Sequence, residues 1–139
     1  RCAAGRAAAY ACAADGGSGG AWDGITRLDV DTAAAFLETE QATYLDVRTA
    51  AECARGVVPG SVCVPMHPDG GMQFSDDFVS KVEALLPDKS ARILVGCAAG
   101  VRSELAIALL ARDGGYEHLA NVEGGFNVWA GMGKPTEIP

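Results

Sequence analysis

A short segment in the second half of the chain carries the residue types of a nucleophilic site. The apolar run at 92–96 predicts a buried strand, and Cys97 follows it directly. A predicted helix begins at Val101, so the small residues in between form a tight strand-to-helix loop. Gly100 permits a backbone turn that other residues resist. We expect the backbone N–H groups of this loop and of the helix start to converge on one point and to favour an anion there.

This environment would make Cys97 a nucleophile. A thiolate beside converging N–H groups is stabilised, so the pKa of Cys97 should fall below the value of about 8.5 for a free cysteine. Arg102 adds a fixed positive charge whose planar fork fits an oxyanion. No histidine lies near Cys97 in the sequence, so a Cys–His pair is not indicated. The alternative is that Cys97 is a small residue in a packed turn and that Arg102 caps the helix or forms a salt bridge.

The elements that must position this loop alternate between strands and helices. Strands are predicted at 25–28, 44–47, 61–65, 92–96 and 119–122, and helices at 33–40, 49–55, 75–86, 101–112 and 124–129. Asp31 and Thr32 are predicted to cap the first helix, and Ser75 the third. This alternation predicts an α/β fold with a central parallel sheet and helices on both faces. Such sheets bind ligands at the carboxyl ends of their strands, where Cys97 lies.

The composition predicts one globular domain and excludes several functions. The chain has 139 residues, of which 49% are hydrophobic, which is enough for one core without disulfide or metal staples. The 11 Lys and Arg residues against 18 Asp and Glu residues give a net charge of −7, which argues against binding to nucleic acid. No apolar run reaches the ~18 residues of a membrane span. The five cysteines match no disulfide framework or zinc pattern, and no metal is expected.

The first 24 residues differ in composition from the rest. They contain nine alanines and six glycines, with Arg1 and Arg6 and no acidic residue before Asp15. Such a segment buries too little apolar surface to offset its ordering entropy, so we predict that 1–24 is flexible. Its basic, acid-poor composition is typical of the end of an organelle transit peptide, and the alternative is a solvated tail.

Taken together, these segments resemble the rhodanese-like sulfurtransferases. The loop from Cys97 to Ser103 is similar to the active-site motif of that family, approximately Cys-x-x-Gly-x-Arg-Ser. The resemblance covers most of residues 25–135, which we take as the rhodanese-like domain. It also rests on Asp46-Val47-Arg48 with Glu52, on Gly56 to Ser61, on Val64-Pro65, on Asn121 to Phe126, and on Trp129 and Pro135. The section 74–94 is similar to single-domain sulfurtransferases of plants and algae, which favours a chloroplast location, with the cytoplasm as the alternative.

The resemblance implies a sulfurtransferase that carries sulfane sulfur as a persulfide on Cys97 and needs no cofactor. It implies a substrate-binding loop made of Ala98, Ala99, Gly100, Val101, Arg102 and Ser103. It implies that Asp46, Arg48 and Glu52 form a supporting charged cluster, for which structural ion pairing is the alternative. The implied donor is a small molecule, namely thiosulfate, 3-mercaptopyruvate or a persulfide. The implied acceptor is cyanide or a thiol such as thioredoxin or glutathione.

The sequence departs from the family pattern in ways that bear on the substrate. Val57 stands where the family has a histidine, which is a small loss because that histidine is regarded as structural. Ala98 and Ala99 are neutral, whereas sulfurtransferases that favour thiosulfate often have basic residues there, so thiosulfate is disfavoured as the natural donor. Four residues separate Cys97 from Arg102. Related phosphatases and arsenate reductases have one residue more, so the shorter loop favours sulfur over phosphate or arsenate.

Two further interpretations remain open from the sequence. The chain could be a regulatory or partner-binding domain with little turnover. Cys97 could instead be a redox sensor that Cys63 or another cysteine resolves, which requires the two Cα atoms to lie within ~7 Å.

Overall fold

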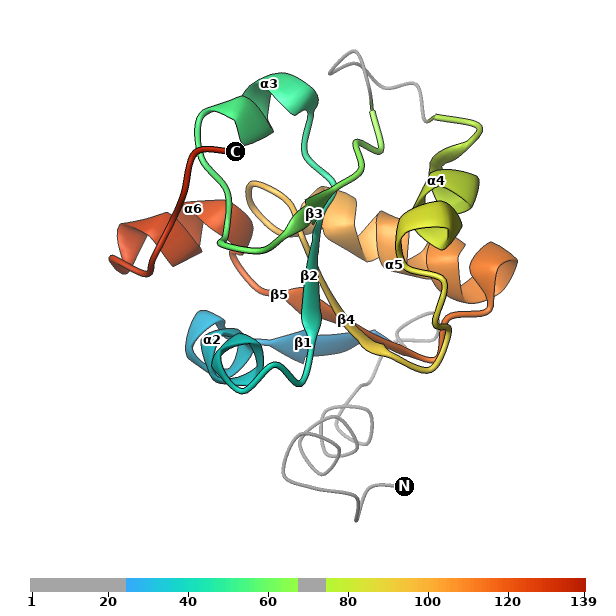
Figure 1. The fold of residues 1–139 in the computed structure, drawn as a ribbon, viewed down its shortest axis with the longest axis horizontal. Coiled ribbons are helices and arrows are strands. Elements are labelled where there is room, and N and C mark those ends of the chain that lie inside the picture. Colours follow the sequence, from blue (N-terminus) through green and yellow to red (C-terminus); the bar gives the residue numbers. More distant parts are fainter. Residues whose placement is uncertain (1–24, 68–74) are drawn as a thin grey trace.

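The computed structural model describes residues 25–67 and 75–139, so the predicted flexible segment at 1–24 lies outside the described residues. Five strands form one parallel sheet in the order β1-β5-β4-β2-β3 (Figure 1). The strands are β1 (Thr26–Leu28), β2 (Thr43–Asp46), β3 (Val62–Cys63), β4 (Arg92–Gly96) and β5 (His118–Val122). β3 is shorter than the predicted 61–65, although the N–H of Val64 still bonds to the carbonyl of Asp46 at 2.9 Å.

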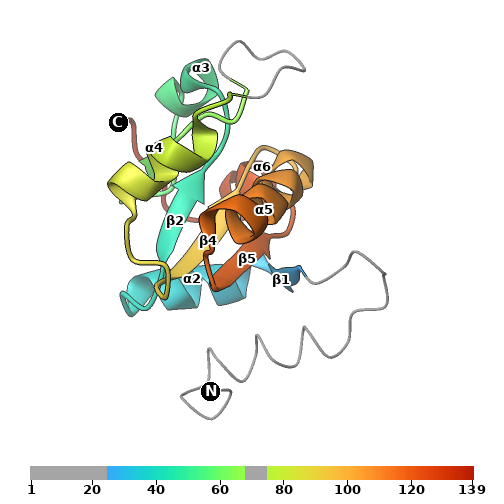
Figure 2. The same ribbon diagram turned by 90° about the vertical axis from the view of Figure 1, so that its right-hand side faces the viewer.

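Helices cover both faces of the sheet. They are α2 (Val30–Glu38), α3 (Ala50–Ala54), α4 (Phe78–Leu85), α5 (Val101–Gly114) and α6 (Gly125–Gly131). Figure 2 shows α4 and α5 together on one face, and α2 lies on the other face with α6. The short α3 follows β2 at the carboxyl edge of the sheet (Figure 1). The predicted α/β fold with a central parallel sheet is therefore confirmed.

The central strand β4 explains the apolar run that precedes Cys97. Ile93 and Val95 belong to the core beneath α4 and α5, and Leu94 belongs to the opposite core with α2 and α6. All three side chains are fully buried. A strand that is buried on both faces is apolar at every position, which gives a continuous run in place of an alternating pattern.

The two predicted helix caps are wrong. Asp29, rather than Asp31 or Thr32, caps α2, because its carboxylate accepts the N–H of Thr32 at 2.8 Å. A cap must stand before the first helical residue to reach the N–H three positions on, and Asp29 has that spacing. At α4 the hydroxyl of Ser75 bonds to the carboxylate of Asp77, so Ser75 stabilises the approach to the helix and does not cap it.

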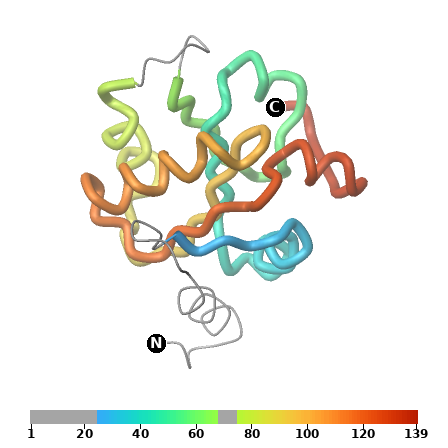
Figure 3. Tube along the Cα trace, turned by 180° about the vertical axis from the view of Figure 1, so that it is seen from behind, coloured from blue at the N-terminus to red at the C-terminus, as the bar shows by residue number. Residues whose placement is uncertain are grey.

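Because all the strands are parallel, their carboxyl ends lie along one edge of the sheet. α3, the loop after β4 and the turn before α6 all begin at this edge. Figure 3 shows the C-terminal segment passing beside α3, where Val57 and Glu137 exchange two backbone hydrogen bonds of 2.8 and 2.9 Å. In the described parts of the chain, no helix has the length and hydropathy needed to cross a membrane.

Candidate active site

Cys97 lies at the carboxyl end of β4, the middle strand of the sheet. Its residue is only 1% exposed, and its sulfur is bound from within its own loop. The backbone N–H of Gly100 donates to Cys97 Sγ at 3.0 Å, and Ser103 Oγ lies 3.5 Å from the same sulfur. Gly100 has φ +102°, a conformation that favours glycine, and this turn directs its N–H back to the sulfur. The turn of the loop therefore brings the N–H of Gly100 to the sulfur of Cys97.

Two opposing effects set the pKa of Cys97. Burial raises it, because desolvation disfavours the thiolate. The hydroxyl and backbone N–H of Ser103, together with the N–H groups of Gly100 and Ala99, lower it by binding the anion. The hydrogen bonds outweigh the burial, and the pKa of Cys97 lies below its ordinary value. The thiolate is therefore stabilised by the loop without a histidine.

Asn121, which has a buried side-chain amide on β5, forms hydrogen bonds to the loop. Ser103 Oγ donates to Asn121 Oδ1 at 2.5 Å, and Asn121 Nδ2 donates to the carbonyl of Gly100 and to Glu104 Oε2, both at 3.2 Å. Asn121 thus joins the start of α5 to the turn that binds the sulfur. Sequence reasoning gave Asn121 no role at the site. The signal in the sequence was an amide side chain among the apolar residues of the predicted strand at 119–122. A buried polar side chain needs hydrogen-bond partners, so such a residue is expected to bind a neighbouring segment.

The turn before α6 fixes the other side of the loop. The N–H of Phe126 donates to the carbonyl of Cys97 at 2.7 Å, and the N–H of Asn127 donates to the carbonyl of Ala98 at 3.0 Å. A Cβ on Gly125 would lie 2.2 Å from the carbonyl oxygen of Cys97, and Gly125 has φ +58°. Only glycine allows this close approach. The carbonyls of Cys97 and Ala98 therefore accept hydrogen bonds from α6, so the N–H groups of the loop point towards the sulfur.

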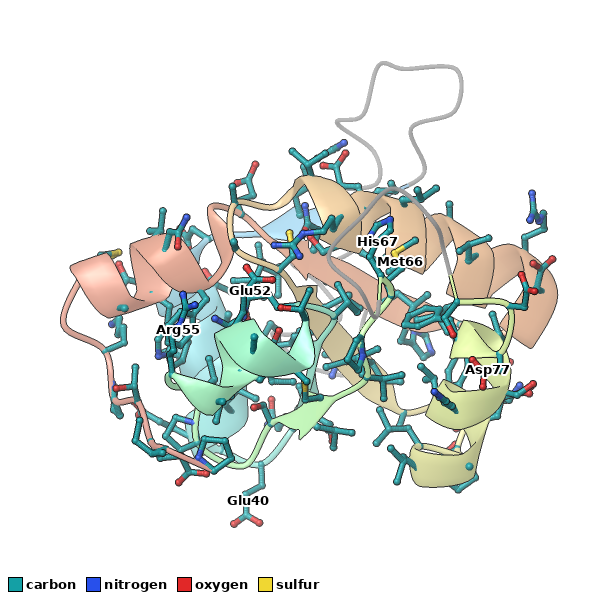
Figure 4. The ribbon with its side chains drawn as sticks, turned by 90° about the horizontal axis from the view of Figure 1, so that it is seen from above. Glu40, Glu52, Arg55, Met66, His67 and Asp77 are labelled. Atoms are coloured by element: carbon teal, nitrogen blue, oxygen red, sulfur yellow. The ribbon has the colours of Figure 1, made fainter. Side chains whose placement is uncertain are left out.

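The predicted charged cluster of Asp46, Arg48 and Glu52 separates into two ion pairs. Glu52 pairs with Arg102 of the loop, through two hydrogen bonds of 2.9 and 3.0 Å. The Arg102 guanidinium lowers the pKa of Glu52 to about 2, with help from the N–H and hydroxyl of Thr49. Figure 4 shows Glu52 projecting from α3 towards the loop that leads into α5.

The second pair, Asp46 with Arg48, is buried, and Arg48 also contacts other elements of the fold. Arg48 Nη2 donates to Asp46 Oδ2 at 2.7 Å and to the carbonyl of Gly56 at 2.8 Å. Its guanidinium also lies over the ring of Phe126, 4.1 Å from the centroid. Arg48 therefore joins β2 to the chain after α3 and to α6.

The outer part of the loop is small and apolar. Ala98 is half-buried, Ala99 is exposed, and Val101 is 77% exposed. Met66, which follows β3, is buried in the same core as Ala106 and Ile107 of α5, and His67 comes next in the chain (Figure 4). The one cation of the loop sequence, Arg102, is already paired with a carboxylate. An approaching donor would therefore meet backbone N–H groups and methyl groups.

Cys63 does not lie within disulfide reach of Cys97. Asp46 on β2 is in register with Gly96 on one side and with Cys63 on the other. Neighbouring strands are about 4.8 Å apart, so Cys63 lies about 10 Å from the end of β4. This exceeds the ~7 Å between Cα atoms that a disulfide allows. Cys63 cannot resolve Cys97 in this fold.

Comparison with known proteins identifies the family. The rhodanese-like domain family matches residues 29–132, which is most of the chain. The chain therefore belongs to the rhodanese-like domain family, as its loop motif indicates.

The similar proteins include two from Arabidopsis thaliana and one solved structure. The protein HIGH ARSENIC CONTENT 1, mitochondrial, is 36% identical over 83% of this chain and 68% of its own length. Thiosulfate sulfurtransferase 16, chloroplastic, is 36% identical over 68% of this chain and 78% of its own length. The rhodanese-like domain of the Anabaena protein Alr3790 has a TM-score of 0.66 at 28% identity, and the match covers 80% of this chain and 77% of that one. Sulfurtransferase activity is thus represented among the relatives.

Proposed function

We propose that this chain is a sulfurtransferase that carries sulfane sulfur as a persulfide on Cys97. The observation that carries the proposal is the hydrogen bond from the N–H of Gly100 to Cys97 Sγ at 3.0 Å, with Ser103 Oγ 3.5 Å from the same sulfur. A site that stabilises a thiolate stabilises the terminal sulfur of a persulfide by the same donors. Membership of a family with sulfurtransferase members supports the same reaction.

The reaction is a double displacement. The Cys97 thiolate attacks the transferable sulfur of the donor. In thiosulfate or a persulfide the S–S bond breaks, and sulfite or a thiolate leaves. In 3-mercaptopyruvate the C–S bond breaks, and pyruvate leaves as its enolate. Cys97 then holds the transferred sulfur as Cys97–S–S⁻. An acceptor thiolate or cyanide attacks this outer sulfur and releases the Cys97 thiolate. Attack requires the thiolate, so the lowered pKa of Cys97 favours the first step.

The loop residues have separate roles in this proposal. The N–H groups of Ala99, Gly100 and Ser103 bind the anionic sulfur. Ala98 and Val101 line the approach with small or apolar side chains, and Arg102 offers limited charge because Glu52 already binds it. Asp46, Arg48 and Glu52 hold the loop and its surroundings in place. No step requires a metal or an organic cofactor.

The pairing of Arg102 with Glu52 favours a donor with little negative charge. Thiosulfate is a dianion, and a site whose single loop cation is occupied gains little from that charge. We propose a persulfide of a small or protein thiol as the donor, and a thiol such as glutathione or thioredoxin as the acceptor. 3-Mercaptopyruvate has a single carboxylate, so its charge lies between that of thiosulfate and that of a persulfide without other charged groups.

Intact mass spectrometry tests the proposal directly. The reduced chain is incubated with thiosulfate, with 3-mercaptopyruvate and with glutathione persulfide, and its mass is then measured. We expect a gain of about 32 Da, one sulfur atom, which a later incubation with thiol removes. Peptide mapping should place the added sulfur on Cys97, and the Cys97→Ser variant should show no gain at that peptide.

Cys63→Ser is the matched control, because it removes a partly exposed cysteine outside the loop and leaves the loop intact. It should keep the gain in mass and the turnover. A Cys97→Ser variant with wild-type turnover would contradict the proposal. A Cys97 that is alkylated as a thiolate but takes sulfur from none of the three donors would favour a partner-binding domain instead.

Arsenate is the second substrate class to test, because one relative is named for high arsenic content. The same protein is incubated with arsenate and glutathione, and arsenite formation is measured. The four-residue spacing between Cys97 and Arg102 disfavours a tetrahedral oxyanion, so we expect no arsenite above the rate of the Cys97→Ser variant. Arsenite formation that depends on Cys97 would make oxyanion reduction the preferred function.

For location, the relatives include proteins named chloroplastic and mitochondrial. We propose the chloroplast, on the composition of residues 1–24. A fluorescent fusion of the full chain, imaged against plastid and mitochondrial markers, tests this. Signal confined to mitochondria or cytoplasm would contradict the proposal.

A further inference from the structure

A chain of hydrogen bonds runs from the sulfur of Cys97 to the edge strand β1. Ser103 Oγ lies 3.5 Å from Cys97 Sγ and donates its proton to Asn121 Oδ1 at 2.5 Å. Asn121 Nδ2 donates to Glu104 Oε2 at 3.2 Å, and the Nε of Arg27 on β1 donates to the same oxygen at 2.8 Å. The side chains of Ser103 and Asn121 are buried. The proposed sulfur-transfer steps give the amide of Asn121 no part.

The partners of Asn121 fix which way its amide faces. Its Nδ2 meets the carbonyl of Gly100 and the carboxylate of Glu104, two groups that only accept hydrogen bonds. The nitrogen end must therefore face them, and the oxygen end must face Ser103. That oxygen takes the one proton of the Ser103 hydroxyl. In this arrangement Ser103 turns a lone pair towards the sulfur of Cys97.

A lone pair on Ser103 suits the thiol of Cys97 and not its thiolate. The protonated sulfur donates to Ser103 Oγ, whereas a thiolate needs a donor. When Cys97 loses its proton to solvent, the hydroxyl must turn from Asn121 to the sulfur in order to bind the anion. The hydrogen bond between Ser103 and Asn121 is then lost. Ionisation of Cys97 therefore competes with the hydrogen bond that Asn121 accepts.

We propose that Asn121 is a positioning residue for Cys97, which acts through the Ser103 hydroxyl and restrains formation of the thiolate. Its role in catalysis rests on the proposed sulfur transfer, in which the thiolate is the attacking group. The Gly100 N–H favours the thiolate in either position of the hydroxyl, and Asn121 opposes it. A thiolate that is less strongly stabilised is the better nucleophile, so the amide balances the amount of thiolate against its reactivity.

The charged surroundings of Cys97 stay the same when Asn121 is replaced. The ionisable groups on the segments around Cys97 are Tyr44 and Asp46 of β2, Glu52 of α3, His67 after β3, and Arg102 and Glu104 of α5. Tyr44 and Arg102 interact with Cys97 electrostatically. A substitution at Asn121 removes none of these groups. Glu104, which loses the amide, keeps its ion pair with Arg27.

The pH dependence of alkylation at Cys97 tests this role, because a regulating amide and a merely structural one predict opposite signs. Asn121→Leu keeps a side chain branched at Cγ but has no acceptor, so the Ser103 hydroxyl turns to the thiolate without losing a bond. We expect the midpoint to fall by roughly 0.5–1 pH unit, which corresponds to one hydrogen bond. Loss of a merely structural amide would loosen the turn at Gly100, and the midpoint would rise or stay in place. Either of those results would overturn the inference.

Ser103→Ala is the background that isolates the route of this effect. It has no hydroxyl to turn, so adding Asn121→Leu should no longer lower the midpoint of Cys97. Iodoacetamide pulses and peptide mapping give the midpoints of the two single variants and the double variant. A fall of the same size with and without the Ser103 hydroxyl would show that Asn121 does not act through it.

A measurement on the wild-type chain decides the inference even if Asn121→Leu fails to fold. The side-chain carbonyl carbon of Asn121 is followed by carbon NMR through the titration of Cys97. We expect its resonance to shift with the midpoint of the alkylation rate, because Oδ1 loses its hydroxyl donor as the thiolate forms. In Ser103→Ala most of this shift should be lost. A wild-type resonance that does not move, or an equal shift in Ser103→Ala, would contradict the role of Asn121.

These readouts use no sulfur donor, so they separate this inference from the proposed function. If wild-type Cys97 gains no sulfur while the midpoint falls in Asn121→Leu, the proposed function is wrong and the action of Asn121 on the thiol is supported. If Cys97 gains sulfur while the midpoint does not fall in Asn121→Leu, the function is supported and the inference is wrong.

Discussion

Arg102 and Glu52 form a two-point ion pair across fifty residues of sequence, with Nη1 2.9 Å from Oε1 and Nη2 3.0 Å from Oε2. The geometry is the planar fork by which arginine recognises a carboxylate, and it would recognise an anionic substrate in the same way. Glu52 therefore competes with the donor for the one cation of the Cys97 loop. Whether the site prefers charged or neutral donors therefore depends on Glu52 of α3 as well as on the loop residues.

Removing the charge of Glu52 should improve the binding of an anionic donor. Glu52→Gln keeps an acceptor for the N–H of Thr49, so the capping of α3 is preserved. We expect the KM for thiosulfate to fall by roughly tenfold, equivalent to about 1.4 kcal/mol, at low ionic strength. The KM for a neutral donor such as dimethyl trisulfide should stay the same. Steady-state kinetics with the two donors give the comparison.

Glu83→Gln is the matched control for that experiment. Glu83 pairs with Lys89 at 2.6 Å on another part of the surface, so its loss removes a carboxylate from an ion pair without touching the loop. It should change neither KM. Equal changes for the charged and the neutral donor in Glu52→Gln would show that α3 had moved and that competition for Arg102 was not the cause.

The reactivity of Cys97 should depend on pH through the bonds that Ser103 supplies. The alkylation rate at Cys97 should rise with pH as the thiolate forms, with a midpoint below the ordinary cysteine value, because the hydrogen bonds lower the pKa. To favour the thiolate, the single proton of the Ser103 hydroxyl must bond to Cys97 Sγ in place of Asn121 Oδ1, so Ser103→Ala should move the midpoint to higher pH. Peptide mapping after pulses of iodoacetamide measures the rate at each pH.

Ser90→Ala serves as the control, because that hydroxyl is exposed and donates to Asp88, away from the Cys97 loop. Its midpoint should match the wild type. Ser103→Ala also leaves Asn121 Oδ1 without its hydroxyl donor, which should lower the free energy of unfolding by about 1–3 kcal/mol. A midpoint that stays in place or falls in Ser103→Ala would contradict the role given to this hydroxyl.

The close contact at Gly125 should make that position intolerant of any side chain. Gly125→Ala places a Cβ 2.2 Å from the carbonyl of Cys97 and forces alanine into φ +58°. We expect a loss of at least about 2 kcal/mol in the free energy of unfolding, and a lower kcat because the loop must shift. Gly131→Ala lies in the same helix in open space, and should be neutral or more stable by up to about 1 kcal/mol. Urea titrations and turnover assays on both variants make the comparison, and equal effects would refute the proposed contact.

The two ion pairs near the site should differ sharply in their contribution to stability. Arg48→Met leaves the carboxylate of Asp46 buried without its partner, which should cost about 3–5 kcal/mol. Arg102→Met breaks a pair whose side chains are more than a quarter exposed, and should cost about 0–1 kcal/mol. Denaturant midpoints of the two variants test this. Equal losses would contradict the assignment of Arg48 to structure.

Local patterns in the sequence predicted the features that depend on neighbouring residues. The apolar run at 92–96 predicted a strand buried on both faces, and β4 occupies the centre of the sheet. The small residues after Cys97 predicted a turn that directs N–H groups to the sulfur, and Gly100 does so. These features follow from periodicity and from the backbone freedom of glycine, which are properties of a few consecutive residues.

The tertiary structure alone decided which distant groups meet. From the sequence we expected one charged cluster of Asp46, Arg48 and Glu52. In the structure, strand register and the packing of α3 place Asp46 with Arg48 in a buried pair, and Glu52 in a separate pair with Arg102. Asn121 reaches the loop because β5 lies beside β4. Cys63 lies away from Cys97, because β2 stands between β3 and β4. Contacts between distant residues depend on how strands are ordered and aligned, and the spacing of residues along the chain does not contain that order.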